Sequence, residues 1–230
     1  MGFLDIEGPF MRLLDRVINL LWLNVIMIVF CLPVFTIGAS FTAMHYVIFK
    51  MLHNEEGYIF RDFYKAFKEN FKAATKIWLV LLAVGAFLGL DIYFIYKGSV
   101  TLPQYYKMGI YILFFMVLLG FVYIFPVLSH YENTMKNTLK NSYAMAMDGF
   151  IKSIVMVALL VAPWLGAAFI PNFIFICLFY GITLPAYLSA TLYEGSFKKF
   201  ERAQERALEA AAEEEAEEAR QDADKKDDKN

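Results

Sequence analysis

Side chains that could do chemistry are sparse within the long apolar runs of this sequence. The run Ile77 to Tyr96 contains one acid, Asp91. An ionised carboxylate inside hydrocarbon is costly unless it faces protein or water, so Asp91 is a candidate functional residue. The predicted helix ends near Lys97, where Asp91 would stay hydrated, and a structural or interfacial role is therefore the alternative. His45 has no acid or cysteine near it in the sequence, and we expect no metal site there.

Uncharged polar side chains are the other candidates inside the apolar runs. Asn19 and Asn24 belong to the first run, and Thr36, Ser40 and Thr42 follow Pro33 in the same run. Side chains of this kind form hydrogen bonds between helices in bilayers, each contributing roughly 0.6–2 kcal/mol. We therefore expect these residues to hold helices together.

No pattern in the sequence indicates an enzyme. A Gly-rich loop ending in Lys and Ser or Thr is absent, and no Ser, His and Asp combination has a catalytic context. The cysteines, Cys31 and Cys177, lie alone in apolar runs and are predicted to be packing residues. We expect a protein without catalytic activity, without a cofactor and without a nucleic-acid partner.

Five aromatic residues share one helical face between residues 60 and 71. Their spacing is i, i+3, i+4, i+7 and i+11, and they are Phe60, Phe63, Tyr64, Phe67 and Phe71. Basic residues occupy the other faces, so the pattern predicts an amphipathic helix in the membrane interface. This helix would either anchor the bundle or provide a docking surface for a partner.

A second candidate docking segment ends at Gly149. The stretch Tyr143 to Gly149 is similar to the cytoplasmic loop through which bacterial importer permeases couple to their ATPase, a loop that reads Glu-Ala-Ala-x-x-Asp-Gly. Ala144, Asp148 and Gly149 match that pattern, whereas Tyr143 and Met145 depart from it. An ordinary helix end at Gly149 is the alternative interpretation.

The elements that must position these residues are membrane helices. Of the 230 residues, 59% are hydrophobic and 19% are charged, a composition too apolar for an ordinary soluble domain. A crossing takes about 20 residues, so the runs 17–49 and 153–193 each suit two crossings. The predicted fold is an all-α integral membrane bundle of about six helices with interfacial amphipathic helices. The helices are expected at about 13–33, 34–52, 77–96, 105–128, 150–170 and 172–193.

Two connections in this bundle are open to more than one reading. The last two helices are predicted to turn near Pro171 and Asn172. Pro33 and Gly38 interrupt the run 17–49, and its second segment either spans the membrane or is re-entrant.

Orientation follows from the positive residues. With the N-terminus inside, the cytoplasmic parts hold all Lys and Arg residues except Lys97 and Lys107. We therefore predict a multi-pass protein of the cell membrane with both termini in the cytoplasm. Residues 1–196 form the membrane domain, and residues 197–230, rich in Ala, Glu, Lys and Asp, form a charged cytoplasmic tail that is helical and then disordered.

Three stretches carry a family resemblance: Met1 to Met11, Leu32 to Tyr46 with its Leu-Pro-Val-Phe-Thr-Ile-Gly segment, and Phe67 to Lys72. Over about residues 1–195 the chain resembles the YesL family of Gram-positive bacterial membrane proteins, whose function is unknown. The resemblance implies a polytopic bacterial membrane protein, often encoded beside carbohydrate importers and polysaccharide-degrading enzymes. It implies no catalytic residue.

Two classes of function follow from these observations. The first is a membrane accessory or scaffold associated with carbohydrate uptake, whose partners are the lipid bilayer and the permease, ATPase or sensor subunits of an importer. The second is a small channel or carrier that moves a solute on its own. Polar side chains that converge on one path would distinguish the second class from the first.

Overall fold

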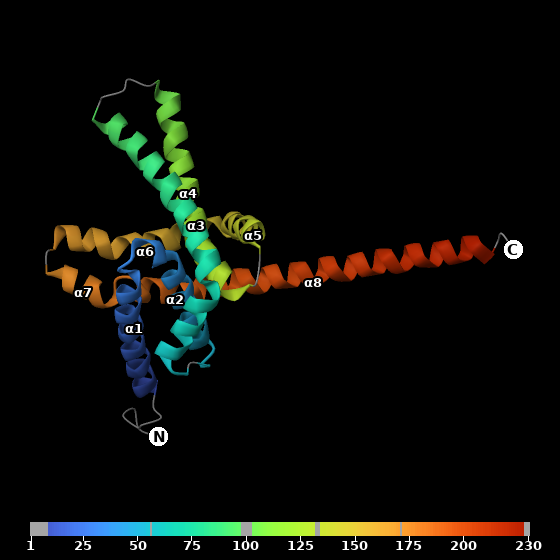
Figure 1. Ribbon diagram of the computed structural model, residues 1–230, viewed down its shortest axis with the longest axis horizontal. Coiled ribbons are helices and arrows are strands. Elements are labelled where there is room, and N and C mark those ends of the chain that lie inside the picture. Colours follow the sequence, from blue (N-terminus) through green and yellow to red (C-terminus); the bar gives the residue numbers. More distant parts are fainter. Residues whose placement is uncertain (1–8, 56, 98–102, 132–133, 171, 228–230) are drawn as a thin grey trace. The chain divides into compact units, whose positions relative to one another are not determined.

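The computed structural model describes residues 9–55, 57–97, 103–131, 134–170 and 172–227, and all regular elements in these ranges are helical (Figure 1). Within these ranges, eight α-helices and one 3-10 turn follow one another. They are α1 (Pro9–Cys31), η1 (Val34–Thr36), α2 (Ile37–Leu52), α3 (Ile59–Tyr96), α4 (Gln104–His130), α5 (Met135–Asp148), α6 (Phe150–Phe169), α7 (Phe173–Tyr180) and α8 (Thr183–Asp227).

The long apolar helices confirm the predicted all-α membrane class. Within the described residues, five helices are long and apolar enough to cross a membrane, and a sixth span results if the bent pair of α7 and α8 counts as one. Asn172 directly precedes α7, as the predicted turn requires, but Pro171 lies outside the described residues. Most of the connection between α3 and α4, residues 98–102, also lies outside them.

The corner between α1 and α2 is built around Pro33. Proline has no N–H and restricts the residue before it, so α1 ends at Cys31 and the chain turns through η1. The Thr36 hydroxyl lies 2.6 Å from the carbonyl oxygens of both Phe30 and Pro33 and shares its proton between them. The Thr36 hydroxyl therefore bonds to backbone carbonyls that have no partner within α1 where that helix ends.

Helix α2 crosses α3 at a point where only glycine fits. A Cβ atom on Gly38 would lie 2.5 Å from Trp78 Cβ and 2.7 Å from the carbonyl oxygen of Ala74. Trp78 also donates its indole N–H to the Val34 carbonyl oxygen at 2.7 Å. The close approach and the hydrogen bond together fix η1 and the start of α2 on α3.

One cluster of the hydrophobic core lies where α2, α3 and α4 meet. It contains six buried residues, namely Ala39, Ala74, Ile77, Ile124, Phe125 and Leu128. Aromatic rings surround this cluster, and the ring of Phe121 packs edge-on to those of Phe41 and Phe125 at 5.8 and 5.3 Å between centroids. The residues of α4 that enter this core come from its second half.

Helix α3 differs from the sequence prediction. A separate interfacial helix was expected before a span at 77–96, but the structure has one continuous helix of 38 residues. At 1.5 Å per residue it is about 57 Å long, nearly twice the hydrocarbon thickness of about 30 Å. The aromatic segment is therefore an extension of the span, because Ala73 to Lys76 contain no helix breaker.

The second half of α3 exposes most of its apolar side chains. Leu79, Val80, Phe87 and Leu90 are all exposed, and a Cβ atom on Gly85 or Gly89 would meet nothing within 4 Å. The first half of α4 is similar, with Tyr111, Ile112 and Leu113 exposed. Surfaces of this kind are expected where lipid is the solvent.

The last predicted span, 172–193, is broken. Helix α7 ends at Tyr180, α8 begins at Thr183, and the two axes differ by 55°. The residue contacts divide the chain into two units, Met1–Leu192 and Tyr193–Asn230, whereas the predicted domain boundary lies at 196/197.

The second unit is helical from its start to Asp227 within the described residues. The rings of Tyr193 and Phe197 pack at 5.1 Å between centroids, and Lys198 pairs with Glu194 at 2.7 Å, four residues apart. Oppositely charged side chains four residues apart stabilise an exposed helix.

Candidate functional site

The aromatic face of α3 divides into a buried part and an exposed part. Phe63 is fully buried, and its ring packs edge-on against Phe30 of α1 at 5.2 Å between centroids. Phe67 contacts the same Phe30 ring at 4.9 Å and Phe71 at 5.4 Å. Phe63 and Phe67 therefore join α3 to α1, and Phe71 is partly buried against the core cluster of α2, α3 and α4.

Phe60 and Tyr64 form the exposed part of that face. Their side chains are 53% and 49% exposed, and their rings stack with centroids 6.2 Å apart. The exposed Lys65 and Lys68 lie on the same stretch of helix. The surface available to lipid or to a partner is thus narrower than the sequence pattern suggested.

Helix α5 forms a corner between the spans α4 and α6. Its inner face consists of buried small and polar residues together with Met145, namely Thr138, Ser142, Met145 and Ala146. The Thr138 hydroxyl donates to the Thr134 carbonyl, and the Ser142 hydroxyl to that of Thr138. These side chains are satisfied by the backbone of their own helix and form no polar path.

Two contacts hold α5 in place. The Tyr143 ring fills space beside Gly120 of α4, where a Cβ atom would lie 2.6 Å from Tyr143 Cζ. Burial at this contact raises the pKa of the Tyr143 phenol above its usual value. On the other side, Ser153 of α6 donates its hydroxyl to the Ala146 carbonyl at 2.9 Å. The corner is therefore fixed to both neighbouring spans.

The residues that match the importer loop pattern lie on the outer side of this corner. Ala144 and Asp148 are exposed one turn apart, and Met147 between them is also exposed. Gly149 is half-buried and donates its N–H to the Met145 carbonyl at 3.0 Å, which ends α5. Gly149 therefore forms an ordinary helix end, which was the alternative interpretation of the sequence. Ala144 and Asp148 nevertheless remain accessible.

Asn24 lies at the break between α7 and α8. Its side chain is completely buried, and its amide nitrogen donates to the Leu178 carbonyl of α7 at 2.7 Å. Its amide oxygen accepts the backbone N–H of Thr183, the first residue of α8, at 3.3 Å. One side chain of α1 therefore replaces hydrogen bonds that the broken helix has lost.

The same face of α1 makes three further polar contacts. The Thr183 hydroxyl donates to the Leu20 carbonyl at 3.1 Å, and Arg16 donates to the Tyr187 hydroxyl at 2.8 Å. Arg16 also donates to the side-chain oxygen of Asn54, which follows α2 with a positive φ of 55°. Residues 16, 20 and 24 follow one another at four-residue intervals, so the contacts form a line along α1.

Sequence reasoning selected Asn24 but did not predict its partners. Gly181 and Pro185 stand four residues apart in the last apolar run, and these residue types mark the break. Asn19 is half-buried and makes no side-chain hydrogen bond within the described part of the chain. Thr36, Ser40 and Thr42 were expected to connect helices, but their hydroxyls bond to backbone carbonyls no more than six residues away.

The remaining candidates lie on different helices in the described part of the chain. His45 is buried in α2, and Asp91 is half-buried about one and a half turns before the end of α3. Among the described residues, no three His, Cys, Asp or Glu side chains are grouped so that they could hold a metal ion. Cys31 and Cys177 are free thiols, on α1 and α7.

Further contacts lie where the ends of α2 and α4 approach the start of α3. The Phe49 ring stacks on the His130 ring at 4.6 Å between centroids, so the two helix ends are side by side. Lys50 forms an ion pair with Asp62 of α3 at 2.9 Å, and Asp62 also accepts the Gly57 N–H. These contacts connect the ends of three helices.

The fold and these contacts define a helical membrane protein. Residues 16–92 match the family "Protein of unknown function, DUF624". The matched stretch runs from Arg16 of α1 to Ile92, near the end of α3. The chain is also similar to the "Uncharacterized protein YteU" of Bacillus subtilis (strain 168), with 24% identity over 185 residues. That similarity covers 80% of this chain and 81% of the relative. No solved structure matches the chain.

These similarities confirm the expected resemblance to bacterial proteins of unknown function. The name YesL is carried by neither comparison and stays a prediction. Of the stretches that carried the resemblance, residues 1–8 lie outside the described residues, and residues 32–46 form the corner at Pro33 and most of α2.

Proposed function

We propose that this chain is a non-catalytic, multi-pass protein of the bacterial cell membrane that acts as an accessory or scaffold in carbohydrate uptake. It would work by binding the permease, ATPase or sensor subunits of an importer. The observation that supports this proposal best is the α5 corner, which is fixed on α4 and α6 and keeps Ala144 and Asp148 accessible.

A fixed corner suits docking for an energetic reason. Ordering a loop during association costs free energy, and a segment that is already held in its bound form avoids much of that cost. A short helix with small and charged residues on its outer side can enter a groove on a partner. The exposed pair Phe60 and Tyr64 adds aromatic surface, which is enriched in protein interfaces.

The carbohydrate part of the proposal rests on the family resemblance, because genes of that family are often encoded beside carbohydrate importers. It is tested by isolating the tagged protein in mild detergent from native cells grown on a polysaccharide. We expect importer or sensor subunits to be recovered with the wild-type chain and lost with Asp148→Lys. Glu209→Lys, the same type of charge reversal at an exposed site of the second unit, serves as the control. Equal recovery with both variants would exclude the α5 corner as the docking site.

The proposed orientation has both termini in the cytoplasm. In a background without the native cysteines, Tyr105→Cys should react with a membrane-impermeant thiol reagent in intact cells, because its side chain is 71% exposed at the start of α4. Lys136→Cys on α5 should react only after lysis. The opposite pattern of labelling would invert the orientation and place the α5 corner outside the cell.

A second candidate function has support from the break between α7 and α8. Discontinuous helices carry the binding sites of many transporters, because freed backbone groups can contact a solute. A carrier should move a labelled sugar into liposomes that contain the purified chain alone. Such flux without a partner would refute the accessory function and establish the carrier.

A further inference from the structure

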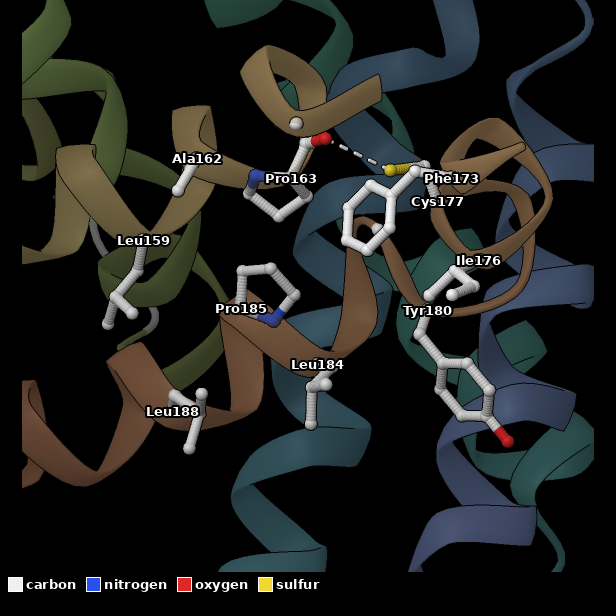
Figure 2. A pocket seen from close by; sticks show the side chains of 12 residues that line it. Leu159, Ala162, Pro163, Phe173, Ile176, Cys177, Tyr180, Leu184, Pro185 and Leu188 are labelled. Carbon is white, nitrogen blue, oxygen red and sulfur yellow. Dashed lines mark hydrogen bonds between the residues drawn. The ribbon is translucent and has the colours of Figure 1, made fainter. Parts of the chain in front are cut away.

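A cavity of about 350 Å³ lies between α6, α7 and the first turns of α8 (Figure 2). Small residues create the space, among them Ala162 and Gly166 on α6 and Gly181 at the break. The Phe173 ring lies over Gly166, where a Cβ atom would be 3.1 Å from Phe173 Cε1. The cavity belongs entirely to the first unit of the chain.

The lining offers no hydrogen-bonding side chain to an occupant. Cys177 already donates its thiol to the Pro163 carbonyl at 3.1 Å, a contact that Figure 2 marks with a dashed line. The Tyr180 hydroxyl points away from Pro163 and Pro185 in the same view. The other lining residues are apolar or glycine. A sugar or an ion would lose its hydration without replacement here, so the cavity suits hydrocarbon.

The size of the cavity limits what can occupy it. An engineered apolar cavity of about 150 Å³ binds benzene, so by proportion 350 Å³ accommodates about a dozen carbon atoms. A stretch of about a dozen carbon atoms of one lipid hydrocarbon chain has this volume.

The surroundings supply that chain. The cavity opens at the surface of the molecule, since its lining residues Ile176, Leu184 and Leu188 are 54%, 40% and 44% exposed. In a membrane this apolar surface faces lipid, and an apolar cavity that stayed empty would lose dispersion contacts along its lining. We propose that the cavity holds the acyl chain of a bilayer lipid, independently of the function proposed above.

The test uses the full chain in phosphatidylcholine vesicles that contain a trace of phospholipid with a photoreactive diazirine in its acyl chain. After illumination, mass spectrometry locates the labelled residues. We expect strong labelling of Ile176, Leu184 and Leu159, compared with Phe115 on the exposed part of α4. Ala162→Phe should fill the cavity and remove most of the label from these three residues while the label on Phe115 stays unchanged.

Matched variants keep the result interpretable. Ala168→Phe introduces the same ring at an exposed position of α6 outside the cavity lining and should label like the wild type. Ala162→Leu fills less of the space and should give an intermediate loss if the phenylalanine variant does not fold. Equal labelling of both phenylalanine variants would overturn the proposal. It would also be overturned if the cavity stayed unlabelled while short crosslinkers joined Ile176 regions of two copies, because a second copy would then occupy it.

Discussion

Asn24→Leu removes the side chain that connects α1 to the broken helix. Leucine has the same number of side-chain heavy atoms and the same branching as asparagine, so the change deletes the amide group without leaving a cavity. In the wild type that amide group contacts the Leu178 carbonyl at 2.7 Å and the Thr183 N–H at 3.3 Å. Both backbone groups lie at a break, where the helix itself supplies no replacement.

The expected cost follows from two lost hydrogen bonds. A buried backbone group left without a partner costs about 1–3 kcal/mol in soluble proteins. Hydrogen bonds between membrane helices have measured values that average about 0.6 kcal/mol and reach about 1.7 kcal/mol. The Thr183 N–H bond is the longer of the two, so we expect Asn24→Leu to lower the free energy of unfolding by about 2 kcal/mol.

The measurement is an SDS titration of the purified protein in mixed micelles, followed by circular dichroism. Asn19→Leu is the matched control, since Asn19 lies on the same helix and makes no side-chain hydrogen bond within the described residues. Its free energy of unfolding should stay within about 0.5 kcal/mol of the wild type. Equal losses in the two variants, or no loss in Asn24→Leu, would refute the role assigned to Asn24.

Three further changes test the packing that positions these elements. Gly38→Ala should destabilise by about 1–3 kcal/mol because its methyl group would collide with α3, whereas Gly85→Ala, which meets nothing within 4 Å, should be neutral or slightly stabilising in the same titration. Phe63→Ala should cost about 3–5 kcal/mol and Phe60→Ala much less, because the first ring is buried and the second is half in solvent. Thr36→Val should cost about 1 kcal/mol by removing the hydroxyl that accompanies the Pro33 corner, and an unchanged midpoint would show that water replaces it.

Apolar length made the class and most helix positions predictable. A run with no formal charge over about 20 residues has few alternatives to a membrane helix, and a run twice that length must turn. The end of α6 at Phe169 and the start of α7 at Phe173, directly after Asn172, agree with the turn that this length requires. The break at Gly181 was not predicted, because apolarity alone does not distinguish a continuous span from two helices that another helix holds together. The partners of Asn24 lie more than 150 residues away, a pairing that no local pattern contains.

The prediction for residues 60–76 used charge and not backbone propensity. The basic residues around the aromatic face suggested a helix lying in the interface, yet Ala73, Ala74 and Lys76 favour an uninterrupted helix into the span. The structure follows the backbone propensity, and the aromatic face packs partly on Phe30. The docking surface that was predicted over five rings is thereby reduced to Phe60 and Tyr64.

The most specific part of the family resemblance has a structural role. In the segment from Leu32 to Gly38, Pro33 ends α1, Val34 accepts the Trp78 indole N–H and Gly38 admits α3. Thr36 bonds to the backbone of the corner itself. The match over residues 16–92 includes this corner, so it supports the architecture more than any activity.

The distribution of buried polar groups bears on whether the chain carries a sugar by itself. A sugar presents many hydroxyl groups, and a site for it needs several protein groups that are free to bond with them. The hydroxyls of Ser40, Thr42 and Ser142 donate to backbone carbonyls one turn earlier in the chain. The Asn24 amide bonds to backbone groups at the break between α7 and α8.

Three buried oxygens without a partner among the described residues remain, those of Thr75, Tyr123 and Ser189. They belong to three different helices, α3, α4 and α8, and none of them lines the cavity between α6 and α8. That cavity is apolar and suits a lipid chain, not a sugar. Docking at the protein surface, above all at the α5 corner, therefore fits the proposed accessory function better than a path through the bundle does. The isolation experiment with Asp148→Lys accordingly takes precedence over the flux assay.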